Sequence, residues 1–320
     1  MAFFTRATAF SPGSIGNMGP GLDVLGCAVE GPGDAVTAEW TDSPGISLSD
    51  PGHPDLPNDP ARHASAIAGM AVIRRATKIG ATTPAQGIAL RVRKGLPLSA
   101  GQGGSAASAV AGAAAVNALI GSPLTREELL AAALVAESTI AGHHLDNIAP
   151  SLMGGIVLIR SMDPIDVVAI PVPEALHLVL AHPAQNLQTS EARAVLPREI
   201  GVDVAVHQMA QVAGIVAACY SDDIDLLGRS IDDRIAEPAR AGLLPGFDRA
   251  KLAALQAGAL GVSISGAGPT LFAVCDSEGL AGEVATAVCA AYDAAGLACV
   301  ARVTRPDRVG TRVETTAAVA

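Results

Sequence analysis

A glycine-rich segment at residues 97–107 has the composition of a phosphate-binding loop. It reads PLSAGQGGSAA, with glycines at Gly101, Gly103 and Gly104. Glycine lets a phosphate approach the backbone closely, and the first N–H groups of a helix have no partner within that helix. A helix that begins near Ser105 would therefore offer free N–H groups, and the positive end of its dipole, to an anion. We expect a nucleotide or another phosphorylated ligand here.

Two common nucleotide-binding motifs do not explain this loop. A Walker A loop needs G-x-x-x-x-G-K-[ST], which the sequence lacks. Residues 101–106 match the loose dinucleotide pattern G-x-G-x-x-A, but a Rossmann unit also needs a second strand that ends in an acidic residue about 20 positions on. A helical pattern follows instead, with Glu127 and Glu128 in a first turn, which disfavours dinucleotide binding.

The nucleotide-binding residues expected from the loop are Pro97, Leu98, Ser99, Ala100, Gly101, Gln102, Gly103, Gly104, Ser105, Ala106 and Ala107.

Local patterns predict the elements that position the loop. A strand at 88–93 leads into it, and helices are predicted at 64–78 and at 126–137, the latter with Thr125 as N-cap and Glu128 in a capping box. Residues 1–40 are β-rich, and the many Pro, Asp, Ser and Gly residues of 41–62 indicate a long surface loop. Because the pattern changes near residue 171, we expect domains at 1–170 and 171–305. The second domain is α+β with an antiparallel sheet, and residues 306–320 form a loose tail.

Composition narrows the class of protein. A chain of 320 residues is long for one core, which agrees with two domains. A net charge of −10 argues against nucleic acid or an anionic membrane as partner, and 2% aromatic residues exclude base stacking as the main binding device. The five scattered cysteines indicate reduced, structural thiols of a cytoplasmic protein. The apolar stretch 106–121 contains Ser108 and Asn117, so it is better interpreted as a buried helix than as a membrane span.

Further motifs accompany the loop in a fixed order. Residues 14–23 read SIGNMGPGLD and residues 265–270 read SGAGPT; between them lie HLDNIAP at 144–150, TSEAR at 189–193 and EPAR at 237–240. Together they resemble the GHMP kinase superfamily, and within it the homoserine kinase family, over the chain to about residue 305. The resemblance implies an α+β fold of two domains, an N-terminal domain similar to ribosomal protein S5 and a ferredoxin-like C-terminal domain. It also implies a cytoplasmic, ATP- and Mg²⁺-dependent enzyme of threonine biosynthesis, a homodimer, that phosphorylates the hydroxyl of L-homoserine.

The resemblance also assigns roles to single residues. For the zwitterionic substrate, Asp23 takes the ammonium group, while Arg193 and Arg240 take the carboxylate through bidentate bonds. Asn17, His144 and Thr189 add hydrogen bonds to the substrate. Asp146 and Asn147 lie near the reacting hydroxyl and, with Asn17, form the expected catalytic set, while Ser105 and Glu137 are the expected Mg²⁺ ligands. The third glycine-rich loop, 265–270, is expected to support the site from the second domain.

The sequence departs from the family pattern in two loops, and this keeps other functions open. The loop serine expected at position 104 is Gly104, and Gln102 replaces a leucine. In the first motif Gly16 stands where the family has alanine. Alternatives are therefore another GHMP small-molecule kinase, with a mevalonate- or shikimate-like substrate, and a non-catalytic member that binds a metabolite. The charged set of Asp23, Arg193 and Arg240 favours an amino acid, because only an amino acid needs both signs of charge.

Overall fold

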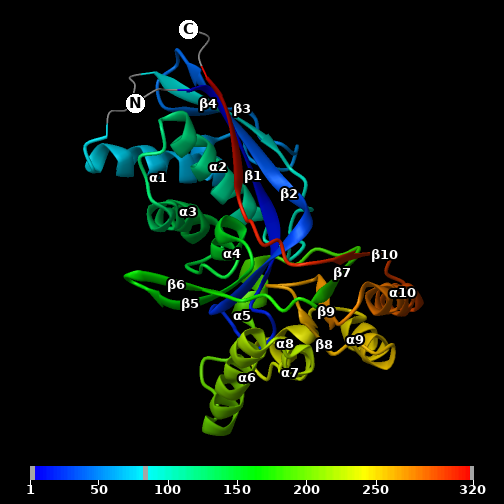
Figure 1. Ribbon diagram of the computed structural model, residues 1–320. Helices are drawn as coiled ribbons and strands as arrows, with labels where there is room; N and C mark the ends of the chain where they lie inside the picture. The colour runs from blue at the N-terminus through cyan, green and yellow to red at the C-terminus, as the bar shows by residue number, and fades with distance from the viewer. Residues whose placement is uncertain (1–3, 82–85, 318–320) are drawn as a thin grey trace.

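Two β-sheets organise the chain, as the computed structural model of residues 4–81 and 86–317 shows (Figure 1). The first sheet has the order β11-β1-β2-β4-β3, and β5 pairs with both β2 and β6. All its pairings are antiparallel except that of β3 with β4. Its strands are β1 (Phe4–Gly16), β2 (Leu25–Thr41), β3 (Ile46–Asp50), β4 (Gly87–Arg93), β5 (Ile156–Met162), β6 (Ile165–Ile170) and β11 (Arg312–Ala317).

Helix α2 is the central helix of the first domain. It packs against β1, β2, α1 and α3, and every residue from Ala106 to Leu119 is buried. Its many alanine and glycine residues permit this close packing on several sides at once. The prediction of a buried helix is confirmed. The predicted capping box of Thr125 and Glu128 is also present. The helices of this domain are α1 (Ala64–Lys78), α2 (Gly104–Leu119), α3 (Arg126–Ile140) and α4 (Ile148–Met153), with the short 3₁₀ helix η1 (Pro60–Arg62).

The second sheet is antiparallel, with the order β10-β7-β9-β8. Successive side chains of a strand point to opposite faces, and β7 buries both of its faces. Val179 and Ala181 join the core under α9 and α10, whereas Leu178 and Leu180 join a second core shared with β2, β5 and α6. The strands are β7 (His177–Pro183), β8 (Gly261–Ile264), β9 (Leu271–Cys275) and β10 (Cys299–Thr304). The helices are α5 (Thr189–Ala194), α6 (Val202–Ser221), α7 (Ile224–Arg229), α8 (Ala236–Ala241), α9 (Phe247–Gln256) and α10 (Glu278–Ala294).

The chain passes from the first sheet to the second between β6, which ends at Ile170, and β7, which begins at His177. The prediction of a loose tail from residue 306 is wrong, because β11 pairs with β1 as an edge strand of the first sheet. The predicted surface loop at 41–62 is also interrupted, since β3 pairs with β4. Both strands depend on partners far along the chain, which a local pattern does not reveal.

One helix of the described chain, α6, is long and apolar enough to cross a membrane by length and composition alone. It lies at the end of the molecule opposite the two termini (Figure 1).

Candidate active site

A cavity of about 530 Å³ lies where the two domains meet. It receives residues from the β1–β2 loop, the start of α2, the end of α3, the segment before α4, and α5 and α8. Every predicted substrate, catalytic and metal-binding residue lines it, together with the predicted loop except Gln102 and Ala107. Gln102 is buried beside the cavity, where its side chain bonds Thr270 and Arg302, and Ala107 packs inside the first domain.

The glycine loop turns directly into α2 at the cavity wall. Gly103 has a left-handed backbone, with φ of 71°, and is the N-cap of the helix. Ser105 is therefore the second residue of α2 rather than its cap. Glycine is needed twice for space: a Cβ at Gly101 would lie 2.5 Å from the Ser265 carbonyl oxygen, and one at Gly103 would lie 2.2 Å from Ser14 Oγ.

The third glycine-rich loop holds the first two in place. The Ser265 hydroxyl donates to the Gly101 carbonyl at 2.7 Å, and the Thr270 hydroxyl donates to the Ala100 carbonyl at 2.6 Å. The Gly266 N–H donates to the Gly16 carbonyl at 3.1 Å. The loop therefore joins the second domain to both of the other motifs, and it also lines the cavity through Gly266 and Ala267.

Asp23 and Arg193 form a bidentate ion pair at one end of the cavity. Nη2 of Arg193 lies 2.5 Å from Oδ1 of Asp23, and Nη1 lies 3.2 Å from Oδ2. Burial acts to lower the pKa of Arg193, but the hydrogen bond and charge of Asp23 outweigh it and raise that pKa. Both side chains remain partly exposed, so a ligand in the cavity can reach them. The pair therefore offers both signs of charge at one place.

The loop that carries Asp23 has an unusual backbone. Asn17, Met18 and Asp23 all have positive φ, with values of 68°, 47° and 61°. Asn17 secures this conformation: its Oδ1 accepts from the Asp23 N–H at 3.0 Å, and its Nδ2 donates to the Gly266 carbonyl at 3.1 Å. Backbone strain of this kind persists where the surrounding contacts impose it, and it is concentrated at functional sites.

Arg240 is a buried cation beside this pair. Its Nε donates to the Ala192 carbonyl at 3.1 Å and its Nη1 to the Gly266 carbonyl at 2.8 Å. Its Nη2 has no hydrogen bond to any residue that the structure describes, and the side chain lines the cavity. Burial and the nearby charge of Arg193 lower the pKa of Arg240. The negative charge of a carboxylate ligand would oppose both effects, because it would stabilise the charged guanidinium group of Arg240.

Glu137, His144 and Asp146 form a buried cluster near Arg193. His144 Nδ1 lies 3.1 Å from Asp146 Oδ1 and 3.8 Å from Glu137 Oε1. Burial raises the pKa of Glu137 to about 7, and the charge of His144 opposes this only in part. Burial acts to lower the pKa of His144, but Asp146 and Glu137 outweigh it, so that pKa is raised.

Glu137 Oε2 and Ser105 Oγ, both buried in this part of the cavity, have no hydrogen-bond partner within the described structure. A buried polar atom without a partner is costly and is usually explained by a missing ligand or ion. A buried carboxylate oxygen and a hydroxyl oxygen suit a hard divalent cation, so the residues present fit Mg²⁺. No group of three or more His, Cys, Asp or Glu side chains within the described ranges is arranged to hold a metal. That is also typical of Mg²⁺, which takes one or two protein carboxylates and completes its shell with substrate phosphates and water.

Two ionisable residues of the cavity wall, Lys94 and His63, were not predicted from the sequence. Lys94 pairs with Asp34, and its Nζ also donates to the Gly104 carbonyl at 3.0 Å and lies 3.1 Å from Ser108 Oγ, so it ties β4 to the start of α2. His63 directs Nε2 to the Pro51 carbonyl at 3.2 Å, which requires the proton on Nε2. Nδ1 is then an acceptor, and it has no partner among the described residues. Position 63 follows a segment predicted only as a surface loop, so no pattern marked it.

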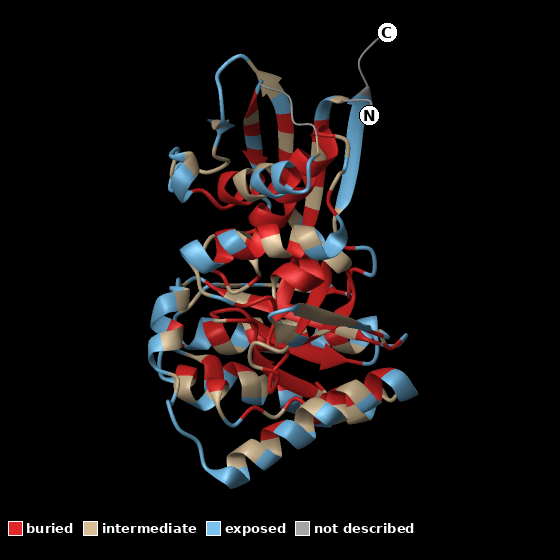
Figure 2. Cartoon of the chain, turned by 90° about the vertical axis from the view of Figure 1, so that its left-hand side faces the viewer, coloured by how far each residue is buried: buried red, intermediate tan, exposed pale blue. Residues whose placement is uncertain are grey.

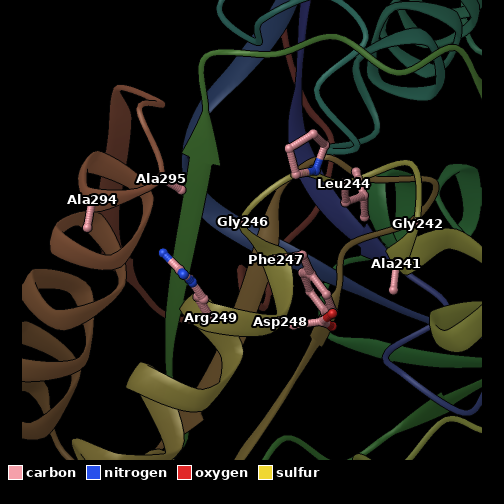
Figure 3. Close-up of a pocket in the computed structure, with 10 residues that line it drawn as sticks. Ala241, Gly242, Leu244, Gly246, Phe247, Asp248, Arg249, Ala294 and Ala295 are labelled. Carbon is pink, nitrogen blue, oxygen red and sulfur yellow. The ribbon is translucent and has the colours of Figure 1, made fainter.

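Another hollow on the surface contains none of the predicted residues (Figure 3). It lies beside α8, α9 and the end of α10, and it is lined largely by alanine, glycine and proline with Asp248 and Arg249. It offers no cluster of titratable groups beyond Asp248 and Arg249, although α9 begins there at Phe247. The interdomain cavity, which collects the predicted residues, is therefore the candidate active site.

Comparison with known proteins fits this geometry. The family of GHMP kinase N-terminal domains matches residues 66–155, and that of GHMP kinase C-terminal domains matches residues 215–294. The homoserine kinase of Chloroherpeton thalassium is 41% identical over 292 residues, which cover 88% of this chain and 91% of that protein. The chain belongs to the homoserine kinase family of the GHMP kinases. The homoserine kinase of Arabidopsis thaliana is 40% identical over 319 residues, which cover 97% of this chain and 85% of the plant protein.

Solved structures give the same family. A crystal structure of homoserine kinase from Cytophaga hutchinsonii superposes with a TM-score of 0.90 at 40% identity, covering 97% of this chain and 98% of that one. A mevalonate kinase from L. major, at 16% identity and a TM-score of 0.69, shares the fold alone. The predicted α+β GHMP kinase fold is confirmed.

Proposed function

We propose that this member of the homoserine kinase family transfers the γ-phosphoryl group of ATP to the hydroxyl of L-homoserine, giving O-phospho-L-homoserine and ADP. The observation that carries the proposal is the placement of the Asp23–Arg193 pair and Arg240 in the same cavity as a glycine-rich helix start. A zwitterion that carries a hydroxyl group fits the charged residues, and the triphosphate of ATP fits the helix start. The relatives named homoserine kinase support the same reaction.

The substrate is held by its charges. Its ammonium group binds Asp23, and its carboxylate binds Arg193 together with the unused Nη2 of Arg240. Because Asp23 and Arg193 already face each other, the substrate extends an existing pair instead of bringing two isolated charges together. Asn17 keeps the Asp23 loop in place, and His144 and Thr189 add hydrogen bonds from the cavity wall.

The nucleotide is held by its phosphates. The loop 97–106 and the first N–H groups of α2 bind the triphosphate, and Gly101 and Gly103 let the loop pack against Ser265 and Ser14 at the start of the helix. Glu137 and Ser105 would hold Mg²⁺. When bound, the ion would neutralise charge on the phosphate oxygens.

The reacting hydroxyl is oriented by Asp146 and Asn147. Asp146 lines the cavity and is buried, with its Oδ1 3.1 Å from His144 Nδ1, and its carboxylate accepts a hydrogen bond from the hydroxyl and then its proton. Asn147 is fixed by the Ser14 hydroxyl, which donates to its Oδ1 at 3.0 Å. Phosphoryl transfer needs alignment and charge neutralisation more than covalent help, which suits this arrangement. All five cysteines are free, as a reducing compartment requires, and we place the enzyme in the cytosol, serving threonine biosynthesis.

A coupled ADP-release assay with Mg·ATP tests the proposal. The panel of acceptors is L-homoserine, L-serine, L-threonine, mevalonate and shikimate. We expect ADP release that depends on L-homoserine and is lost in Asp23→Ala and Arg240→Ala, while Arg249→Ala, in the other hollow, serves as matched control. Release with mevalonate or shikimate instead would indicate another GHMP kinase. Binding of Mg·ATP without turnover of any acceptor would indicate a metabolite-binding member.

A further inference from the structure

Gln208 is a buried polar residue on α6, a helix that otherwise enters the core through apolar side chains. The helix lies at the end of the molecule and is exposed along much of its length (Figure 2). Its other buried residues are Ile215, Ala218 and Cys219, which belong to the core shared with β2 and β5. Gln208 is 6% exposed. A buried amide is costly unless it is hydrogen-bonded, so the partners of Gln208 explain its presence.

Both polar groups of the Gln208 side chain have partners. Nε2 donates to the Pro20 carbonyl at 3.0 Å and to Asp233 Oδ1 at 3.0 Å, and Oε1 accepts from the Arg234 N–H at 2.8 Å. The opposite orientation of the amide would set its oxygen against two acceptors and its NH₂ group against a donor, so these partners fix the orientation. Gln208 therefore connects the β1–β2 loop, which contains Pro20, to the segment before α8.

Asp233 extends this connection to the start of α8. Its Oδ1 also accepts from the Ile235 N–H at 2.8 Å and from the Ala236 N–H at 3.1 Å, and its Oδ2 accepts from the Glu237 N–H at 2.8 Å. The side chain is buried, and hydrogen bonds from backbone N–H groups to a carboxylate are strong. Arg240 follows Glu237 by three residues on the same helix. Asp233 therefore fixes the beginning of the helix that carries Arg240.

The two segments joined in this way carry opposite charges of the cavity. Pro20 lies between Asn17 and Asp23 in the chain, and Asp23 lines the cavity, as Arg240 does from α8. A second connection between them is the Gly266 carbonyl, which accepts from Asn17 Nδ2 at 3.1 Å and from Arg240 Nη1 at 2.8 Å. The loop that carries Asp23 and the helix that carries Arg240 are thus joined at two places.

We propose that Gln208, together with Asp233, is a positioning residue for the amino-acid substrate and sets the separation between Asp23 and Arg240. The inference rests on the proposed function, because it concerns the recognition of L-homoserine. An α-amino acid carries its ammonium and carboxylate groups on one carbon, so their separation is fixed. A site that binds both groups needs its own charges at a matching separation, and a small displacement weakens binding. Gln208 does not line the cavity, so it acts through the segments that it joins.

Steady-state kinetics and titration calorimetry of Gln208→Leu test the proposal. Leucine has a similar size but no hydrogen-bonding group, so we expect the KM and the Kd for L-homoserine to rise about ten-fold, while kcat and the KM for Mg·ATP change by less than about two-fold. Gln211→Leu makes the same change at a half-buried position of the same helix and should match the wild type in all these values. Circular dichroism shows whether each variant is folded.

An exchange of the two side chains tests the bond between them. Gln208→Glu keeps the shape of the side chain, but it cannot donate to Asp233 and sets two carboxylates against each other. We expect it to weaken the binding of L-homoserine at least as much as Gln208→Leu. Combined with Asp233→Asn, the carboxylate again faces an amide, so the Kd for L-homoserine should return towards the wild-type value. A Kd no better than that of Gln208→Glu alone would overturn the role of this pair.

The outcomes distinguish this proposal from the proposed function. An unchanged affinity for L-homoserine in folded Gln208→Leu, or an equal loss of kcat and of the affinities for both substrates, would overturn the positioning role. A wild-type chain that binds L-homoserine but releases no ADP would refute the proposed transfer, while the comparison of Kd values would still decide the role of Gln208. A wild-type chain that does not bind L-homoserine would overturn both proposals.

Discussion

Replacing Glu137 by glutamine should stabilise the metal-free protein while it removes activity. Glu137 is buried, and one of its carboxylate oxygens has no partner among the described residues. Burial raises its pKa in the folded state from 4.5 to about 7. A carboxyl group with a raised pKa is harder to ionise in the folded protein than in the unfolded chain, so its ionisation costs stability. Glutamine has a similar shape and carries no charge.

The size and sign of the effect follow from linkage. Ionisation of Glu137 lowers the free energy of unfolding. This decrease is absent below about pH 4.5, grows as the pH rises, and becomes constant above about pH 7, where it reaches about 3 kcal/mol. About 2 kcal/mol of this arises between about pH 5.5 and pH 8. His144 acts in the same direction, because its raised pKa gives stability that is lost as the pH rises. That contribution is present in both proteins, although it is smaller without the charge of Glu137.

Thermal unfolding in the presence of EDTA measures the effect. For a domain of this size, 2 kcal/mol corresponds to a shift of about 4–8 °C in Tm. We therefore expect the advantage of Glu137→Gln over the wild type to grow by that amount from about pH 5.5 to pH 8. Glu283→Gln, at an exposed position on α10, is the control and should show no such growth. With Mg·ATP added, the wild type should gain more than the variant, because the carboxylate then has its cation.

Two results would refute this reasoning. If the difference in Tm between variant and wild type were the same at both pH values, Glu137 would not be a carboxylate held at a cost. If Glu137→Gln kept its turnover and its response to Mg·ATP, the carboxylate would not hold the metal.

Three other substitutions test separate parts of the site. A Cβ at Gly16 would lie 2.5 Å from Asp146 Oδ2 and 2.6 Å from Asn147 Nδ2, so Gly16→Ala should lower kcat about 100-fold, and an unchanged kcat would argue against both residues. A Cβ at Gly104 would meet nothing nearer than Lys94 Nζ at 3.4 Å, so Gly104→Ser should fold normally and lower the KM for ATP about three-fold by adding a hydroxyl; a higher KM would contradict this. Arg193→Lys loses the bidentate geometry, so steady-state kinetics should show the KM for L-homoserine raised at least about ten-fold with the KM for ATP unchanged.

Features set by neighbouring residues could be predicted from the sequence. The helix at 64–78 and the capping box at Thr125 depend on side chains within one or two turns, and both are present as predicted. The burial of Glu137 could not be predicted, because it arises only when the end of α3 meets the segment that holds His144. Lys94 was missed for the same reason, since its partner Asp34 lies 60 positions away on β2.

The glycine motifs contain features that the sequence predicted and one that it did not. Their order along the chain identified the family, and the expected support from residues 265–270 takes the form of the Ser265 and Thr270 contacts. The replacement of alanine by Gly16 had no explanation in the sequence. In the structure it leaves room for Asp146 and Asn147 against the first loop.

The pairing of β11 with β1 has a consequence for the synthesis of the protein. Phe4 pairs with Ala317, so the first sheet takes one of its edges from a segment that is synthesised after the whole of the second sheet. The domain that carries the glycine loop begins first, yet its sheet is completed only after the second domain has emerged. Until then, β1 presents an open edge that can pair with other chains. The second domain can close its own sheet earlier, so the order of completion is the reverse of the order of translation.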